Sequence, residues 1–187
     1  MLPVSAPITW RRLDTPGHES ARLSTEAGHP IIEGMAVFAM DGESCALAYQ
    51  VTCDRAWRTT AADVDGWVGA TPVSMRIRRE PTGRWIVNGL HTPSLDGCDD
   101  VDLSFSPATN TLPIRRLGLA VGVKADVVAA WWNVPGVALA PLEQTYERIG
   151  PFTYRYTSTD GAFVALLDVR ADGLLTRYAG LWDEVRG

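Results

Sequence analysis

The amino-acid sequence predicts a mainly β protein with a large, strongly curved antiparallel sheet, like a half-barrel, wrapped around a short helix. Three observations indicate this fold class. Residues 45–53, 73–79 and 152–158 alternate apolar and polar side chains with a period of two, as half-buried strands do. Turn-forming residue pairs recur, in places about every dozen residues, which is typical of antiparallel hairpins. Helix signals are almost confined to residues 112–117.

The other strands follow from similar alternation or from short apolar runs. They are expected at residues 8–13, 21–25, 31–40, 57–64, 84–90, 101–105, 126–134, 144–149, 162–169 and 173–180. Turns are expected at Asp41-Gly42, Asp65-Gly66, Pro81-Thr82-Gly83, Pro135-Gly136, Asp160-Gly161 and Asp172-Gly173. So many strands must curl into a barrel or half-barrel, or split into a sandwich. The concave face of a curled sheet must be filled by its own side chains, a plug segment or a ligand.

The short helix predicted at residues 112–117 has recognisable end signals. Pro113 lies in its first turn, where a missing backbone N–H removes no helical hydrogen bond. Thr111 or Asn110 can cap its start, and Gly118 follows its end. We expect this helix to be the plug inside the curved sheet.

Composition excludes several classes of protein. The length of 187 residues fits a single β-rich domain over residues 1–187, and a chain of this size can bury a core without metal or disulfide bonds. The net charge of −5, without a long basic block, argues against a nucleic-acid partner. No run approaches the ~20 apolar residues of a transmembrane helix. The N-terminus lacks the basic start and apolar run of a signal peptide, so a cytoplasmic location is expected.

The three cysteines also fit a reducing compartment. Cys45 and Cys53 are expected on one strand, where eight residues span roughly 26 Å, too far for a disulfide bond. Cys98 lies in a separate acidic segment. We therefore expect reduced thiols.

The densest acidic segment is a candidate for metal binding or catalysis. Its aspartates are Asp96, Asp99, Asp100 and Asp102. The glycine and glutamate of a calcium-binding EF-hand loop are missing, and the three histidines are isolated, so neither a metal nor a cofactor is expected. Nucleophile-elbow and phosphate-loop motifs are absent from the sequence. Asp99 and Asp102 could instead form the carboxylate pair of a hydrolase.

Aromatic and arginine residues suggest a ligand cavity. There are seven tryptophans, and the adjacent Trp131 and Trp132 must point to opposite faces of their strand. Arg115 and Arg116 diverge by about 100° on a helix, so at least one could turn inward and pair with Asp99, Asp100 or Asp102. Such a pair could lock the plug against the sheet, or present its guanidinium to a ligand head group beside Asn110. The two roles are compatible.

The stretch DGCDDVDLSFSPATNTLPIRRLGLAVG, residues 96–122, resembles the signature of the bacterial glycolipid-binding family. The order of shorter motifs is similar along nearly the whole chain. They are Trp10-Arg11, a G-x-A-V-F-like strand at 34–38, Y-x-V-x-C-D at 49–54, Gly-Arg-Trp at 83–85 and D-G-L-L-x-x-Y at 172–178. The sequence departs from the family pattern in two segments. Ala108 stands where an aromatic residue is often found, and residues 178–182 read Tyr-Ala-Gly-Leu-Trp instead of Tyr-Pro-x-Leu-Phe.

The resemblance implies a fold similar to bacterial lipoprotein carriers (lipoprotein-localisation factors) and a glycolipid or other amphiphile as ligand. It supplies no catalytic residues. The residues expected to anchor or lock the polar end are Asp99, Asp102, Asn110, Arg115 and Arg116. The residues expected to line the cavity are Tyr49, Trp57, Trp85, Tyr146 and Tyr156.

We therefore predict non-catalytic binding of a small amphiphile, without nucleic acid, metal or cofactor. One alternative is a hydrolase that acts on a lipid or sugar ester, or on a glycosidic bond, through the acidic segment. Another is a protein-interaction module whose aromatic side chains all belong to the core. The sequence carries no signal for an oligomeric state.

Overall fold

The computed structural model describes residues 5–136 and 138–186. These residues form one 15-stranded sheet that is not closed into a barrel, in the order β8-β7-β6-β5-β4-β3-β2-β1-β15-β14-β13-β12-β11-β10-β9. The strands are β1 Ile8–Arg12, β2 Gly17–Glu26, β3 His29–Met40, β4 Glu43–Cys53, β5 Thr59–Val68, β6 Thr71–Arg79, β7 Trp85–Val87, β8 Leu90–His91, β9 Asp100–Leu103, β10 Lys124–Trp132, β11 Leu139–Gly150, β12 Thr153–Ser158, β13 Phe163–Val169, β14 Leu175–Tyr178 and β15 Trp182–Glu184. The predicted mainly β fold is confirmed.

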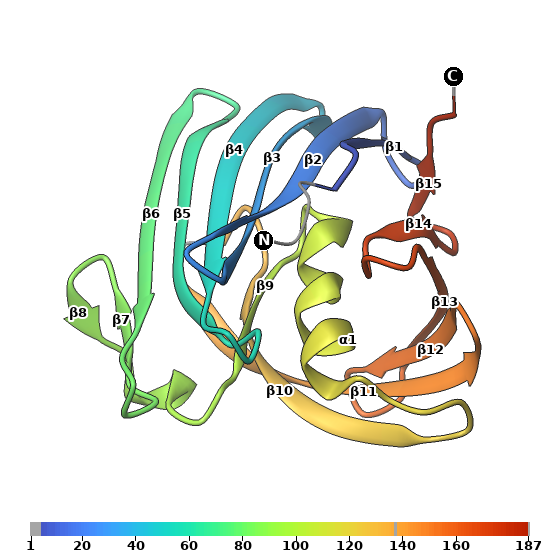
Figure 1. Cartoon of the computed structure of the whole chain (residues 1–187). Helices are drawn as coiled ribbons and strands as arrows, with labels where there is room; N and C mark the ends of the chain where they lie inside the picture. Colours follow the sequence, from blue (N-terminus) through green and yellow to red (C-terminus); the bar gives the residue numbers. More distant parts are fainter. Residues whose placement is uncertain (1–4, 137, 187) are drawn as a thin grey trace.

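The helical plug is the connection between two neighbouring strands. Adjacent strands of the sheet run antiparallel except β9 and β10, which run parallel. Parallel neighbours need a crossover of a dozen or more residues. Here the crossover contains the 3₁₀-helix η2, Pro107–Asn110, and the helix α1, Thr111–Leu117. Figure 1 shows α1 inside the curve of the sheet, between the strands of the two halves of the chain.

Local residue choices explain where the plug begins and ends. The hydroxyl of Ser106 accepts a hydrogen bond from the backbone N–H of Ala108, which caps η2. Gly118 ends α1 in the left-handed conformation with φ 52°, and its N–H donates to the carbonyl of Ile114. The helix predicted at residues 112–117 is therefore confirmed, with one additional residue at its start.

Aromatic side chains fill the interior next to β3 and β4. The ring of Phe105 lies 6.3 Å from the ring of Phe38 and meets Tyr49 and Trp132 edge-on at 5.9 and 6.0 Å. Leu112 of α1 is fully buried. This side of the concave face is thus filled by the protein's own side chains, including those of the plug.

Three local expectations differ from the structure. The predicted turn at Asp65-Gly66 is wrong, because both residues continue β5. A Cβ at position 66 would lie 1.9 Å from the carbonyl oxygen of Ala46, so this glycine permits a close approach of β4 and β5. Trp57 lies in a turn before β5, with φ 68°, and not in a strand. The strand expected at 84–90 is split by a turn into β7 and β8.

In the part of the chain described here, no helix has both the length and the apolar character needed to cross a membrane. The expectation that the N-terminus carries no signal peptide depends in part on residues 1–4, which lie outside the described residues.

Candidate ligand-binding cleft

A cleft of about 250 Å³ lies between the β9–η2 segment and the strands of the C-terminal half. Its lining combines polar groups of β9 and the plug with aromatic and aliphatic groups of β10 to β15. The lining residues are Asp102, Leu103, Ser104, Ser106, Asn110, Trp131, Leu142, Tyr156, Ser158, Thr159, Phe163, Tyr178, Leu181 and Trp182. Of the residues predicted from the sequence, the cleft brings together Asp102, Asn110 and Tyr156.

Asp102 is the acidic group of this cleft. It lies opposite Trp131 in the β9–β10 register, so both side chains belong to the face that lines the cleft. Its Oδ2 accepts a hydrogen bond of 2.6 Å from Nε2 of Gln144. Burial raises the pKa of Asp102 to about 6, although hydrogen bonds from Gln144 and Thr109 oppose this shift.

Asn110 is held in place by a residue behind the cleft. Its side chain is almost fully buried, and its Oδ1 accepts a 2.8 Å hydrogen bond from the hydroxyl of Tyr146. The Nδ2 of Asn110 reaches the carbonyl of Pro107 only at 3.4 Å. Tyr146 was predicted to line the cavity. In the structure it orients a lining residue and does not itself border the cleft.

Aromatic rings form one wall of the cleft. The ring of Tyr156 meets the rings of Tyr146, Phe163 and Tyr178 at 5.1, 6.0 and 6.0 Å, each in an edge-to-face arrangement. Trp131 lines the cleft, whereas Trp132 packs on Phe105, so the two tryptophans do point to opposite faces. The cleft therefore offers ring faces as well as hydrogen-bonding groups.

Arg116 locks the plug against β9. Its guanidinium binds both carboxylate oxygens of Asp100, whose side chain is 2% exposed, and lies 3.4 Å from Asp99. Asp99 also accepts a hydrogen bond of 3.1 Å from Arg58, just before β5. The predicted inward turn of one arginine is confirmed for Arg116. Its partners are Asp99 and Asp100, whereas Asp102 accepts a hydrogen bond from Gln144.

Arg115 is not among the residues that line the cleft and packs on Trp57. Its guanidinium lies 5.1 Å from the ring centre of Trp57 and donates to the carbonyl of Ala171 at 3.4 Å. Trp85 is fully buried, and its indole N–H donates to the carbonyl of Cys98 at 3.1 Å. None of these three predicted site residues lines the cleft.

Sequence reasoning missed Glu19, a buried carboxyl on β2. Its Oε1 accepts hydrogen bonds of 2.5 Å from Tyr49 and 2.6 Å from Ser106, while its Oε2 is buried with no hydrogen-bond partner. Burial raises the pKa of Glu19 to about 8. The sequence feature that could have revealed Glu19 is its alternation with Ala21 and Leu23. This alternation places all three side chains on the inward face of β2.

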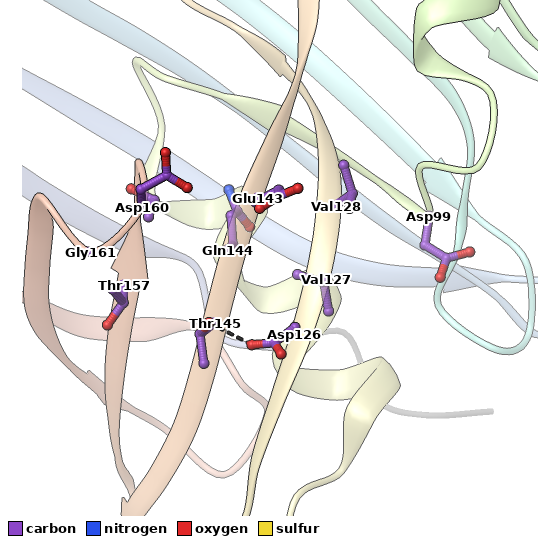
Figure 2. A pocket seen from close by; sticks show the side chains of 11 residues that line it. Asp99, Asp126, Val127, Val128, Glu143, Gln144, Thr145, Thr157, Asp160 and Gly161 are labelled. Atoms are coloured by element: carbon purple, nitrogen blue, oxygen red, sulfur yellow. Dashed lines mark hydrogen bonds between the residues drawn. The ribbon is translucent and has the colours of Figure 1, made fainter.

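A wider hollow of about 600 Å³ lies over β10, β11 and β12 (Figure 2). Its carboxylates are those of Asp99, Asp126, Glu143 and Asp160. Glu143 and Thr145 alternate with the inward Gln144 and Tyr146, so this hollow lies on the outer face of the sheet. Among the described residues, no three His, Cys, Asp or Glu side chains are arranged to hold a metal ion.

Because Asp99 borders the outer hollow and Asp102 the inner cleft, the two carboxylates expected to act as a hydrolytic pair do not converge on one cavity. Tyr49 borders a further shallow groove on β2 to β4.

An open, curved sheet with a helical crossover plug and a small interior cleft defines a mainly β protein of the half-barrel class. Residues 7–184 match the family described as "Putative glycolipid-binding", and the chain belongs to this family. The resemblance predicted from the sequence is thereby confirmed.

The fold is also similar to that of a DUF1089 family protein from Pseudomonas aeruginosa, known from a crystal structure at 1.80 Å resolution. The two chains share 30% sequence identity with a TM-score of 0.78, over 89% of this chain and 92% of that chain. The comparison with curated proteins gave no match.

Proposed function

We propose that this protein binds a glycolipid or similar amphiphile non-covalently, with the head group in the cleft beside Asp102. The observation that carries the proposal is the meeting of Asp102, Asn110 and Ser158 with a wall of aromatic rings in one cleft. Sugar rings present hydroxyls at their edges and C–H groups on their faces, so they suit both kinds of surface.

The size of the cleft determines how much of the ligand it holds. Pockets that enclose a drug-sized ligand have volumes of about 300–1,000 Å³. At about 250 Å³, this cleft has room for a head group and the first part of a chain. Leu142, Phe163 and Leu181 offer apolar contacts to that first part, and the remainder of an acyl chain extends beyond the cleft.

Titration with n-octyl β-D-glucoside below its micelle concentration tests the proposal. Binding should change the fluorescence of the tryptophans that line the cleft, Trp131 and Trp182. We expect Trp131→Ala to weaken binding at least tenfold. The matched control is Trp67→Ala, which removes a tryptophan that is 51% exposed on β5, away from the cleft, and should leave affinity unchanged.

Two results would contradict the proposal. One is the absence of saturable binding to the wild-type protein by calorimetry. The other is equal affinity in the Trp131→Ala and wild-type proteins. Organic extraction and mass spectrometry of protein purified from its own host would independently reveal a bound lipid.

A further inference from the structure

The charges around the cleft are one-sided. Among the residues that line it, Asp102 is the single side chain with a formal charge at neutral pH, and there is no lysine, arginine or histidine. Burial raises the pKa of the Tyr156 and Tyr178 hydroxyls above their ordinary value, so both phenols stay uncharged. The fixed charge in the cleft is therefore negative.

The arginines of the plug do not neutralise this charge. Arg116 is bound to Asp100 and Asp99, and Arg115 lies over the ring of Trp57. The partner of Asp102 is the neutral amide of Gln144. A second carboxyl, that of Glu19, contacts the lining residue Ser106 from behind the cleft and adds no positive charge.

This arrangement favours some head groups over others. A carboxylate accepts hydrogen bonds from hydroxyl groups, and such charge-assisted bonds are about twice as strong as neutral ones. An anionic head group would place a second negative charge beside Asp102 in a partly desolvated cleft, where water screens the repulsion poorly. A phosphate site would need arginine, lysine or backbone N–H donors directed at the ligand.

We propose that the cleft selects an uncharged, hydroxyl-rich head group and discriminates against anionic ones, with Asp102 as the specificity-determining residue. This inference rests on the proposed amphiphile-binding function and specifies the class of ligand. It separates neutral glycolipids, as expected ligands, from anionic phospholipids and sulfolipids.

A matched pair of amphiphiles tests the inference. n-Octyl β-D-glucoside and n-octyl sulfate carry the same chain, and the sulfate keeps one negative charge throughout the working pH range. Calorimetric titration below the micelle concentrations, at pH 8 and low salt, should show the wild-type protein binding the glucoside at least tenfold more tightly than the sulfate.

Three variants assign the preference to its cause. Asp102→Asn should reduce the ratio of the two affinities to about threefold or less, because the amide keeps the shape of the side chain and loses its charge. Leu181→Lys, which places a cation in the lining, should raise the affinity for octyl sulfate independently of Asp102. Asp126→Asn, in the outer hollow, removes a carboxylate of the same kind and should leave the ratio unchanged.

The outcomes separate this inference from the proposed function. Equal binding of the two amphiphiles, or tighter binding of the sulfate, overturns the inference and leaves amphiphile binding intact. A preference that persists in the Asp102→Asn protein overturns the role of Asp102. If neither amphiphile binds, the proposed function fails and the inference fails with it.

Discussion

Arg116 on α1 and Asp100 on β9 form a two-point ion pair that joins the crossover plug to the edge of the sheet. Burial raises the pKa of Asp100 above its ordinary value, and the hydrogen bonds from Arg116 act in the opposite direction. Removal of one partner of a buried ion pair strongly destabilises the folded protein, because the other charge stays buried without compensation. Replacement of both partners by apolar residues often leaves the stability unchanged.

Arg116→Met should therefore lower the free energy of unfolding by about 3–5 kcal/mol, because it leaves Asp100 buried without its partner. The double variant Arg116→Met/Asp100→Leu should recover most of this loss. Urea unfolding measures both. Arg155→Met, which breaks an exposed ion pair with Glu147, serves as control and should cost about 0–1 kcal/mol. If Arg116→Met and Arg155→Met lowered the free energy of unfolding by similar amounts, the Arg116–Asp100 pair would not be what fastens the plug.

Glu19 should make the protein less stable as the pH rises. Its folded pKa of about 8 lies above its ordinary value of 4.5, so the unfolded chain releases the proton first. The stability that depends on the protonated form is full below about pH 4.5 and is lost progressively as the pH rises to about 8. Glu19→Gln keeps an acceptor for Tyr49 and Ser106 and cannot ionise.

Urea midpoints at pH 5, 6.5 and 8 check this expectation. The difference in stability between the Glu19→Gln and wild-type proteins should move in favour of the variant as the pH rises, while contributions from other groups cancel. If the stabilities of the two proteins changed with pH in the same way, Glu19 would not titrate with a raised pKa.

Gly34 allows Tyr49 to reach Glu19. A Cβ at position 34 would lie 2.7 Å from the hydroxyl of Tyr49 and 2.8 Å from the carbonyl oxygen of Ser20. Gly34→Ala should therefore cost about 1–3 kcal/mol of stability, since the tyrosine must move. In Gly150→Ala the new Cβ meets Thr153 at an ordinary 3.6 Å, so thermal unfolding should change much less. Equal losses of stability in Gly34→Ala and Gly150→Ala would rule out a clash with Tyr49 as the cause.

The three cysteine thiols should be unreactive in the folded protein. All three are buried and free, and burial raises the pKa of Cys98 to about 11. A neutral disulfide reagent reacts with the thiolate, so the native protein should show negligible reaction at pH 8 and three reactive thiols in denaturant. Rapid labelling of the native protein would contradict the packing around these residues.

Several elements could be predicted because their signals are local. Alternation of side chains predicts most strands, and Pro113 with Gly118 predicts the helix. The opposite orientation of Trp131 and Trp132 follows from strand geometry alone. Gly66 misled the prediction, because a glycine that permits close contact between strands has the same sequence signal as a turn.

The cleft was only partly predictable because its contacts join distant residues. Ser106 and Glu19 are 87 positions apart, and Gln144 and Asp102 are 42 apart. Hydrophobic patterning does not determine such pairings. The sequence indicated an inward arginine, but Arg116 meets Asp100 because the parallel β9–β10 pairing brings the crossover back over β9.

The neighbours at the centre of the sheet come from opposite ends of the described chain. Trp10 of β1 stands opposite Glu184 of β15. During synthesis, β1 has no hydrogen-bonding partner on that side until residues 182–184 emerge from the ribosome. An unpaired strand edge is a template for association with other chains. A protein truncated before Trp182 should therefore be aggregation-prone, although it would retain every residue of the cleft except that tryptophan.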